Sequence, residues 1–250
     1  MKGITYIFPV FNLSENEELL KKAYKSIGKQ DNVIFVGSEE DLGLVKFRGV
    51  NKIVNETGDL SYASQVMLAL KSVNTDYFAV IEQDDEVIPK WYEFVGGLIE
   101  KDTDDTFAFL PLTEVIDNED GETIGYANEA FWASSFANNI GYLDSGALEN
   151  YLNFNVSGGV FKTKEFLSLG GLKKSMKLVF WYEFLLRALY KEKKIYVVPR
   201  VGYLHKVNRK NTITSIYEET LSEKEAEWWL ELAKKEFYFP QDRNKTYEEE

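Results

Sequence analysis

The sequence has no cysteine, one histidine and only five prolines among its 250 residues. Without cysteine the chain can form neither disulfides nor thiolate metal sites. Its apolar runs are all far shorter than the ~20 residues that a membrane-spanning helix needs. The opening residues, MKGITYIFPVFN, carry one lysine and lead directly into a strand pattern, unlike a signal peptide. We therefore expect a cytoplasmic protein without a membrane span.

Basic charge is also scarce, since 29 Lys and Arg face 41 Asp and Glu, for a net charge of −12. Such a surface repels nucleic acid and anionic lipid unless a local basic patch overrides it. We therefore expect no nucleic-acid partner. The one dense basic stretch, from His205 to Lys210, fits two interpretations: a solvated loop or a site for a phosphorylated ligand.

The first 110 residues alternate between strand and helix patterns. Strands are expected at 4–10, 33–36, 50–54 and 77–81, and helices with one apolar face lie between them. Ser14 is expected to open the first helix, Asp59 or Ser61 a later one, and Pro89 fits the first turn of another. This rhythm predicts an α/β fold with a largely parallel sheet covered on both faces.

The remaining residues follow a less regular order. They contain an expected strand at 107–112, helices at 163–169 and 179–191, a strand at 195–198 ended by Pro199, and a terminal helix at 222–237. No repeat or low-complexity linker separates the two parts, so we expect them to share one sheet. The chain is expected to form a single domain over residues 1–217, followed by a helix and acidic tail over 218–250.

Acidic residues gather where the apolar strand at 77–81 ends, at Glu82, Asp84, Asp85 and Glu86. Open α/β sheets bind ligands at the carboxyl ends of their strands. A divalent cation between these carboxylates and a phosphorylated ligand would turn their repulsion into attraction. Hard oxygen ligands of this kind suit Mg²⁺ or Mn²⁺. The alternative is a solvated turn whose acids complement the dipole of the next helix.

The order of these motifs resembles glycosyltransferase family 2, which has the GT-A fold. ITYIFPVFN is similar to the first strand of the family, and the segment 58–65 resembles its Gly…Ala-Arg-Asn helix. VIEQDDEVIP resembles the metal-binding DxD stretch, with Glu82 and Asp84 in the positions of the two acids. The acceptor-side segment of the family resembles VSGGVFKTKEFLSLGGL. Its Glu-Asp-x-x-Leu-x-x-Arg helix resembles FWYEFLLRAL, and the strand and loop that follow this helix resemble VVPRVGYLHK. The match covers residues 3–206.

The resemblance implies a GT-A-type, Rossmann-like sheet flanked by helices. Residues 1–110 would bind a nucleotide-sugar donor, and residues 111–217 a carbohydrate or another hydroxyl acceptor. It also implies Mn²⁺ or Mg²⁺ on the donor diphosphate, and transfer by a single displacement with inversion. A metal neutralises the charge that develops on a nucleoside diphosphate leaving group.

Candidate site residues follow from the resemblance, position by position. We expect Asp84, Asp85 and His205 to bind the metal, although a lone histidine fits a surface or structural role equally well. The residues expected to bind the donor are Pro9, Phe11, Gln65, Glu82, Gln83 and Asp84.

Two positions depart from the pattern of the family. The acid that recognises the nucleobase in the family corresponds to Gly37 or Ser38 in this sequence, so the sequence does not identify the nucleotide of the donor. The family's catalytic Asp falls on Trp181, whose indole offers no acceptor for a proton. We expect Glu183 to serve as general base, on a helix that begins only after Trp181.

The alternative role for Glu183 is an ion pair on a helix surface. These departures also keep open a second function, a catalytically silent GT-A domain that serves as a binding or assembly module. A nucleotidyltransferase is a weaker alternative, because the chain lacks a Gly-rich loop bearing Arg or Lys near its start.

Overall fold

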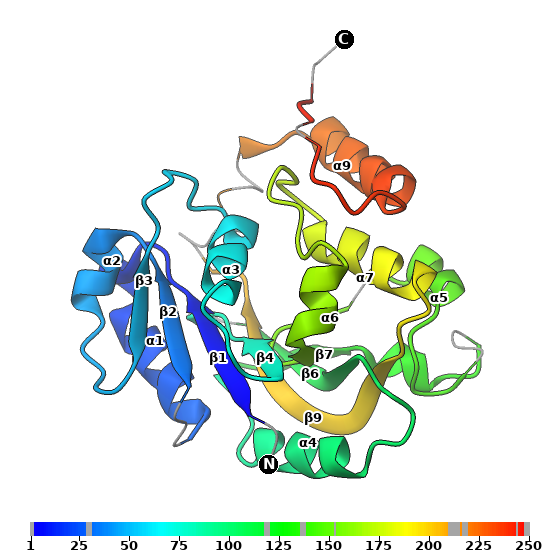
Figure 1. Ribbon diagram of the computed structural model, residues 1–250, viewed down its shortest axis with the longest axis horizontal. Helices are drawn as coiled ribbons and strands as arrows, with labels where there is room; N and C mark the ends of the chain where they lie inside the picture. The colour runs from blue at the N-terminus through cyan, green and yellow to red at the C-terminus, as the bar shows by residue number, and fades with distance from the viewer. Residues whose placement is uncertain are drawn as a thin grey trace.

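The computed structural model describes residues 3–28, 32–117, 121–135, 139–152, 154–209, 216, 220–243 and 245–247. The first part alternates strands and helices, as the patterns predicted (Figure 1). Its elements are β1 (Ile4–Pro9), α1 (Leu13–Ser26), β2 (Val33–Gly37), α2 (Glu39–Leu44), β3 (Asn51–Val54), α3 (Tyr62–Leu70), β4 (Tyr77–Val80), β5 (Glu86–Val87) and α4 (Trp91–Lys101).

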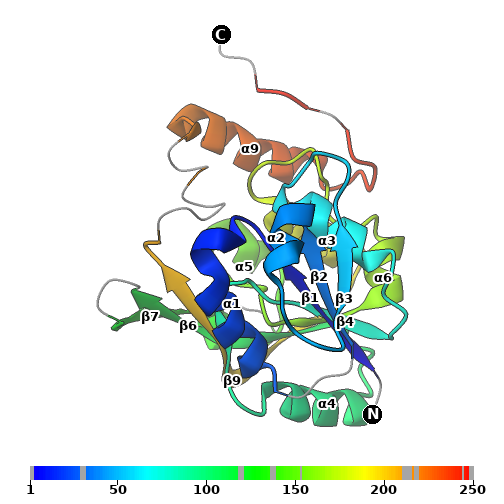
Figure 2. The same ribbon diagram turned by 90° about the vertical axis from the view of Figure 1, so that its left-hand side faces the viewer.

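The second part adds longer strands and the helices that cover them. Its elements are β6 (Ala108–Asp117), β7 (Thr123–Ala127), the 3₁₀ helix η1 (Glu129–Trp132), α5 (Ser145–Asn150), β8 (Val160–Lys162), α6 (Thr163–Ser168), α7 (Phe180–Tyr190), β9 (Ile195–Val207) and α9 (Glu223–Glu236). In both views α9 and α4 lie at opposite ends of the molecule (Figures 1 and 2).

The strands of the described residues form one sheet, in the order β3-β2-β1-β4-β8-β6-β9-β5, with β7 paired to β6. Strands β1 to β4 are mutually parallel, and β6 is parallel to β9. Strand β8 runs antiparallel to both β4 and β6 and so connects the two parts. The expectation of one shared, mostly parallel sheet is confirmed.

The central strands are buried on both faces, which explains their continuous apolar runs. In β1, Ile7 packs into a core beneath α3, α6 and α7, whereas Tyr6 and Phe8 enter a second core with α1 and α4. Alternate residues point to opposite faces of a strand, so one apolar run supplies both cores. Helix α9 packs on α7, where Trp229 is 1% exposed.

The predictions for Ser14 and Pro199 are wrong. Ser14 does not cap α1, because the helix begins at Leu13 after Asn12, which is in the left-handed region (φ 50°). Pro199 does not end the last strand, because β9 continues to Val207. The register between β6 and β9 shifts next to Pro199, and such a bulge accommodates a residue that has no N–H to pair.

The prediction for Ser61 is confirmed, whereas Pro89 lies before Lys90, the N-cap of α4, and not in the first turn of that helix. The Ser61 side chain accepts a hydrogen bond from Ser64 N at the start of α3. The Ser222 side chain accepts one from Glu225 N at the start of α9. Among the described residues, no helix combines the length and the apolar character that crossing a membrane requires.

Candidate functional site

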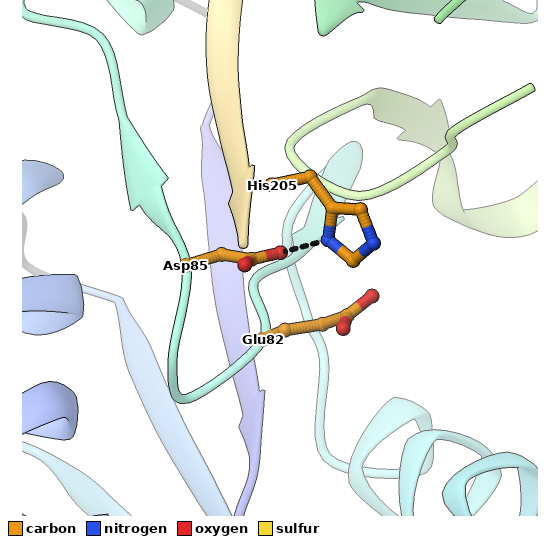
Figure 3. Close-up of side chains that lie close together, drawn as sticks. All are labelled: Glu82, Asp85 and His205. Atoms are coloured by element: carbon orange, nitrogen blue, oxygen red, sulfur yellow. Dashed lines mark hydrogen bonds and ion pairs between the residues drawn. The ribbon is translucent and has the colours of Figure 1, made fainter. Parts of the chain in front are cut away.

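The acidic cluster lies where β4 ends and the chain turns into β5. Strand β5 pairs antiparallel with the end of β9, so that Glu86 lies opposite Leu204. This pairing brings His205 beside Asp85, 120 residues earlier in the chain. Figure 3 shows Glu82 and Asp85 extending from the turn toward the same region as the His205 ring. The sheet therefore gathers three ligand-type side chains at the carboxyl end of β4.

Asp85 orients the imidazole. It is 1% exposed, its Oδ2 lies 2.9 Å from His205 Nδ1, and its Oδ1 accepts a hydrogen bond from Lys206 N at 2.9 Å. A carboxylate on one ring nitrogen fixes the ring and directs the other nitrogen toward a ligand, as is usual for metal-binding histidines. Ligand atoms of Glu82, Asp85 and His205 all lie within 4.8 Å of one another. Carboxylates with an imidazole are a donor set that fits Mn²⁺.

Burial and mutual repulsion perturb the titration of this cluster. Burial, and next the charge of Asp85, raise the pKa of Glu82 to about 7 and that of Asp84 to about 6. Burial disfavours the charged form of His205, but its charge interaction and hydrogen bond with Asp85 outweigh this and raise its pKa to about 9. Negative charge is thus concentrated where a bound cation would relieve the repulsion.

Glu82 has structural partners on two sides. Its Oε1 accepts a hydrogen bond from Ser157 Oγ at 2.6 Å, and its backbone N donates to Tyr203 Oη at 3.1 Å. The Tyr203 ring in turn packs against Gly158, where a Cβ would lie 2.4 Å from the ring. Glycine at position 158 therefore permits the close approach of the Tyr203 ring.

Asp84 lies apart from the cluster of three. Its Oδ2 lies 2.8 Å from Arg209 Nη1, and Arg209 Nη2 donates to Asn16 Oδ1 at 3.0 Å. Both charged side chains are largely buried, at 14% and 10% exposure. The acid expected first as metal ligand thus faces a cation of the chain itself, and Asp84 would need Arg209 to move before binding a metal.

The predicted donor-binding residues are only partly free to bind a donor. Pro9 and Phe11 lie at the end of β1, beside Gln83. The Gln83 amide accepts from Phe11 N at 2.9 Å and donates to Phe11 O at 2.6 Å, so it joins the ends of β1 and β4. Gln65 is fully buried; its Nε2 donates to Leu60 O, and its Oε1 has no hydrogen-bond partner among the described residues.

The positions expected to read the base are used for close packing and capping. A Cβ at Gly37 would lie 2.8 Å from the Val10 carbonyl oxygen. The Ser38 side chain caps α2 by accepting from Asp41 N, and it donates to Asp41 Oδ2. Asp41 Oδ1 accepts from Leu13 N at 2.7 Å, at the start of α1. The role of Asp41 was missed, although Ser38 followed three residues later by an acid is a capping signal.

Glu183 is fully buried in a pair of ion contacts. Its Oε2 lies 2.7 Å from Arg187 Nη2, and its Oε1 lies 2.9 Å from Lys173 Nζ. Helix α7 begins at Phe180, so the expected late start after Trp181 is wrong. A carboxylate enclosed between two cations does not reach an acceptor hydroxyl. The geometry therefore argues against Glu183 as general base and gives it a role in holding α7 in place.

Aromatic side chains occupy the place where the family pattern has its catalytic acid. Trp181 stacks on Phe161 with centroids 5.4 Å apart, and Phe180 stacks on Tyr62 at the same distance. Burial, and next the charge of Glu82, raise the pKa of Tyr62 well above its ordinary value. Tyr62 thus lies between the start of α7 and the carboxylates. No motif in the sequence indicated its position.

No model of a protein family matches this chain, and no curated protein matches it either. Among solved structures it is similar to S. aureus TarS. The structure of TarS 1–349 is 16% identical with a TM-score of 0.60, covering 82% of this chain and 60% of that one. The complex of TarS 1–349 with UDP-GlcNAc is 15% identical with a TM-score of 0.63, covering 95% and 73%. The fold is that of a GT-A-like glycosyltransferase.

That likeness confirms the predicted α/β, GT-A-type fold. The complex of TarS 1–349 with UDP gives a TM-score of 0.61 at 16% identity, with coverage of 95% of this chain and 72% of that one. The chain spans 60% of the length of the first of these structures. At such low identity the comparison establishes the fold, and the site must be argued from the residues of this chain.

Proposed function

We propose that the protein is a glycosyltransferase that moves a sugar from a nucleoside diphosphate donor to a hydroxyl acceptor. The observation that carries this proposal is the convergence of Glu82, Asp85 and His205 at the carboxyl end of β4. The fold similarity supports it, because two of the similar TarS structures hold UDP and UDP-GlcNAc. A carbohydrate is the acceptor class we propose first, with other hydroxyl compounds as alternatives, and we expect no nucleic acid.

The site fits a divalent cation, Mn²⁺ or Mg²⁺. Glu82 and His205 would hold it, and Asp85 would fix the His205 ring as well as contribute charge. When bound, the cation would neutralise charge on the diphosphate leaving group. Hydrogen bonds within the chain hold the carboxylates of this site in place: Ser157 Oγ donates to Glu82, and Lys206 N donates to Asp85.

Arg209 belongs to the same end of the sheet and meets Asp84 rather than solvent. A guanidinium is also a preferred partner of phosphate oxygens, through paired hydrogen bonds. We propose that Arg209 leaves Asp84 when a diphosphate is bound and contacts the phosphate. Asp84 would then be free to complete the metal site.

A silent GT-A domain that binds a nucleotide sugar without transferring it is the second candidate. Trp181 at the position of the expected acid, and the burial of Glu183 against Arg187 and Lys173, favour it. Hydrolysis or transfer of a donor sugar with Mn²⁺ present would distinguish the two candidates. Binding without any turnover, over a range of acceptors, would favour the silent domain.

The direct test of donor binding is a thermal-shift screen of UDP, GDP and their sugars, each with Mn²⁺ and with chelator. A ligand at about 100 times its dissociation constant adds roughly 2.7 kcal/mol to the free energy of unfolding. We expect one nucleoside diphosphate family to stabilise the protein, more strongly with Mn²⁺. If no nucleotide stabilises it with metal present, the proposed donor site is wrong.

A further inference from the structure

A cavity of about 480 Å³ lies beyond the start of α7, on the side that faces α9. Figure 1 shows α9 lying over α7 there. Its walls are almost entirely apolar: Phe154, Phe180, Trp181 and Tyr182 contribute aromatic rings, and Leu230 closes it from α9. Cavities of ~300–1,000 Å³ with apolar walls and few polar groups are the usual sites for small molecules.

One polar atom in these walls lacks a partner. Tyr182 is 1% exposed, and its Oη has no hydrogen-bond partner among the described residues. Buried polar atoms are paired in nearly all folded proteins, so an unpaired one calls for an explanation. A ligand that is apolar but carries a hydrogen-bonding atom would satisfy it.

The cavity also adjoins the candidate donor site. Phe180 and Trp181 form part of its wall, and Phe180 stacks on Tyr62, which lies beside Glu82. Val179, just before them, has a φ of 52°, in the left-handed region that a β-branched residue rarely adopts. The backbone is therefore held in a strained turn that presents these two rings between the cavity and the carboxylates.

We propose that this cavity binds an aromatic group carried by the acceptor, a proposal that rests on the glycosyltransferase function. Flat rings on several walls favour stacked or edge-on contact with another ring. The volume is ample for an aromatic group of two fused rings. Sugar hydroxyls would find few partners on walls of this composition, and leaving them unpaired on burial would be unfavourable.

The test compares two probes that share a sugar and differ in the aromatic group, 2-naphthyl β-D-glucopyranoside and methyl β-D-glucopyranoside. Calorimetric titration should show at least tenfold tighter binding of the naphthyl compound. Ala226→Trp would fill the cavity from α9 and should weaken naphthyl binding at least tenfold. Lys235→Trp on the same helix, where the side chain is 74% exposed, is the matched control and should bind like the wild type.

Leu152→Glu is a second variant, in case Ala226→Trp does not fold. Leu152 lines the cavity and is 49% exposed, so a charge there is tolerated by the fold but disfavours an apolar ligand. Equal affinity for the two probes, or unchanged naphthyl binding in a folded cavity variant, would overturn the proposal. UDP binding with Mn²⁺, measured on the same samples, separates the two claims. If the protein binds UDP but not the naphthyl probe, the cavity proposal alone is wrong. If it binds the naphthyl probe but not UDP, the transferase function is wrong, and with it the acceptor role of the cavity.

Discussion

The two ends of the candidate site have opposite chemistry. At the carboxyl end of β4, two acids and a histidine lie close together, and the pKa of Glu82 is raised by burial and by Asp85. At the start of α7, Phe180 and Trp181 present aromatic rings, and the nearby acid Glu183 forms a buried ion pair with Arg187. The difference teaches that buried acids indicate a ligand site where they outnumber their counter-charges: Glu82 and Asp85 share one histidine, whereas Glu183 alone has two cations.

The largest expected effect separates these two kinds of acid. Glu183→Gln leaves Arg187 and Lys173 buried without their counter-charge and should lower the free energy of unfolding by about 3–5 kcal/mol. Glu165→Gln is the matched control, since its pair with Lys193 is partly exposed and should matter by less than about 1 kcal/mol. Urea unfolding followed by circular dichroism measures both. A stable Glu183→Gln protein that binds nucleotide but has lost transfer would restore Glu183 as the general base.

The second effect concerns the metal end. His205→Ala should weaken Mn²⁺-dependent nucleotide binding by about 10- to 100-fold, the range typical for disturbed metal sites. Binding measured with chelator should change little. Arg200→Ala on the same strand is the control, because Arg200 lies over the Phe94 ring and away from the cluster. Equal loss with and without metal would mean that His205 supports the fold rather than a cation.

The third effect is a pH dependence of stability in the metal-free protein. Raised pKa values of Glu82 (about 7), Asp84 (about 6) and His205 (about 9) mean that the folded state holds these protons more tightly than the unfolded state. Their contribution is therefore present at low pH and is lost as pH rises through these values. From pH 5 to 9 the free energy of unfolding should fall by more than about 1.4 kcal/mol, the equivalent of one pKa unit, because each of the three groups is shifted by more than that.

Chemical unfolding at a series of pH values checks this trend. Glu82→Gln should flatten it, and Mn²⁺ should stabilise the protein more at high pH, where the ligands are deprotonated. Stability that rises over the same range would show that the cluster is not the strained element described above.

The smallest effect tests Asp84. Arg209→Ala removes the counter-ion of Asp84. If Asp84 joins the metal, the Mn²⁺ affinity should rise by about two- to fivefold, because Mn²⁺ no longer competes with an ion pair worth ~0.5–1 kcal/mol. Asp84→Asn should lower Mn²⁺ affinity by a similar factor while the fold persists. Titration of Mn²⁺ by calorimetry compares the two variants. If neither substitution changes Mn²⁺ affinity, Asp84 is a structural partner of Arg209.

The sequence predicted β1 to β4, β6 and the start of β9 because local patterns determine them, whereas β5 and β7 were missed. The apolar run of β4 and the capping serines at Ser61 and Ser222 depend on neighbours a few residues away. Pro199 was misread because the bulge that accommodates it belongs to the pairing of β9 with β6, which is not visible in β9 alone.

The site was predicted less completely for the same physical reason. His205 and Asp85 were both named, but their hydrogen bond depends on the pairing of β5 with β9. Arg209 was noticed only as part of a basic stretch, and its contact with Asp84 spans 125 positions. Glu183 and Arg187 are four residues apart on a helix, so their ion pair was readable from spacing; its burial was not, since Lys173 comes from outside the helix.

The most direct test of the central claim uses the fact that the chain has a single histidine. Electron spin-echo spectroscopy of Mn²⁺ bound together with UDP detects nitrogen nuclei in the first coordination shell of the metal. The account predicts a nitrogen coupling that changes when histidine is labelled with ¹⁵N and disappears in His205→Ala. A Mn²⁺–nucleotide complex that forms without any histidine nitrogen coupling would contradict the assignment of the metal to Glu82 and His205.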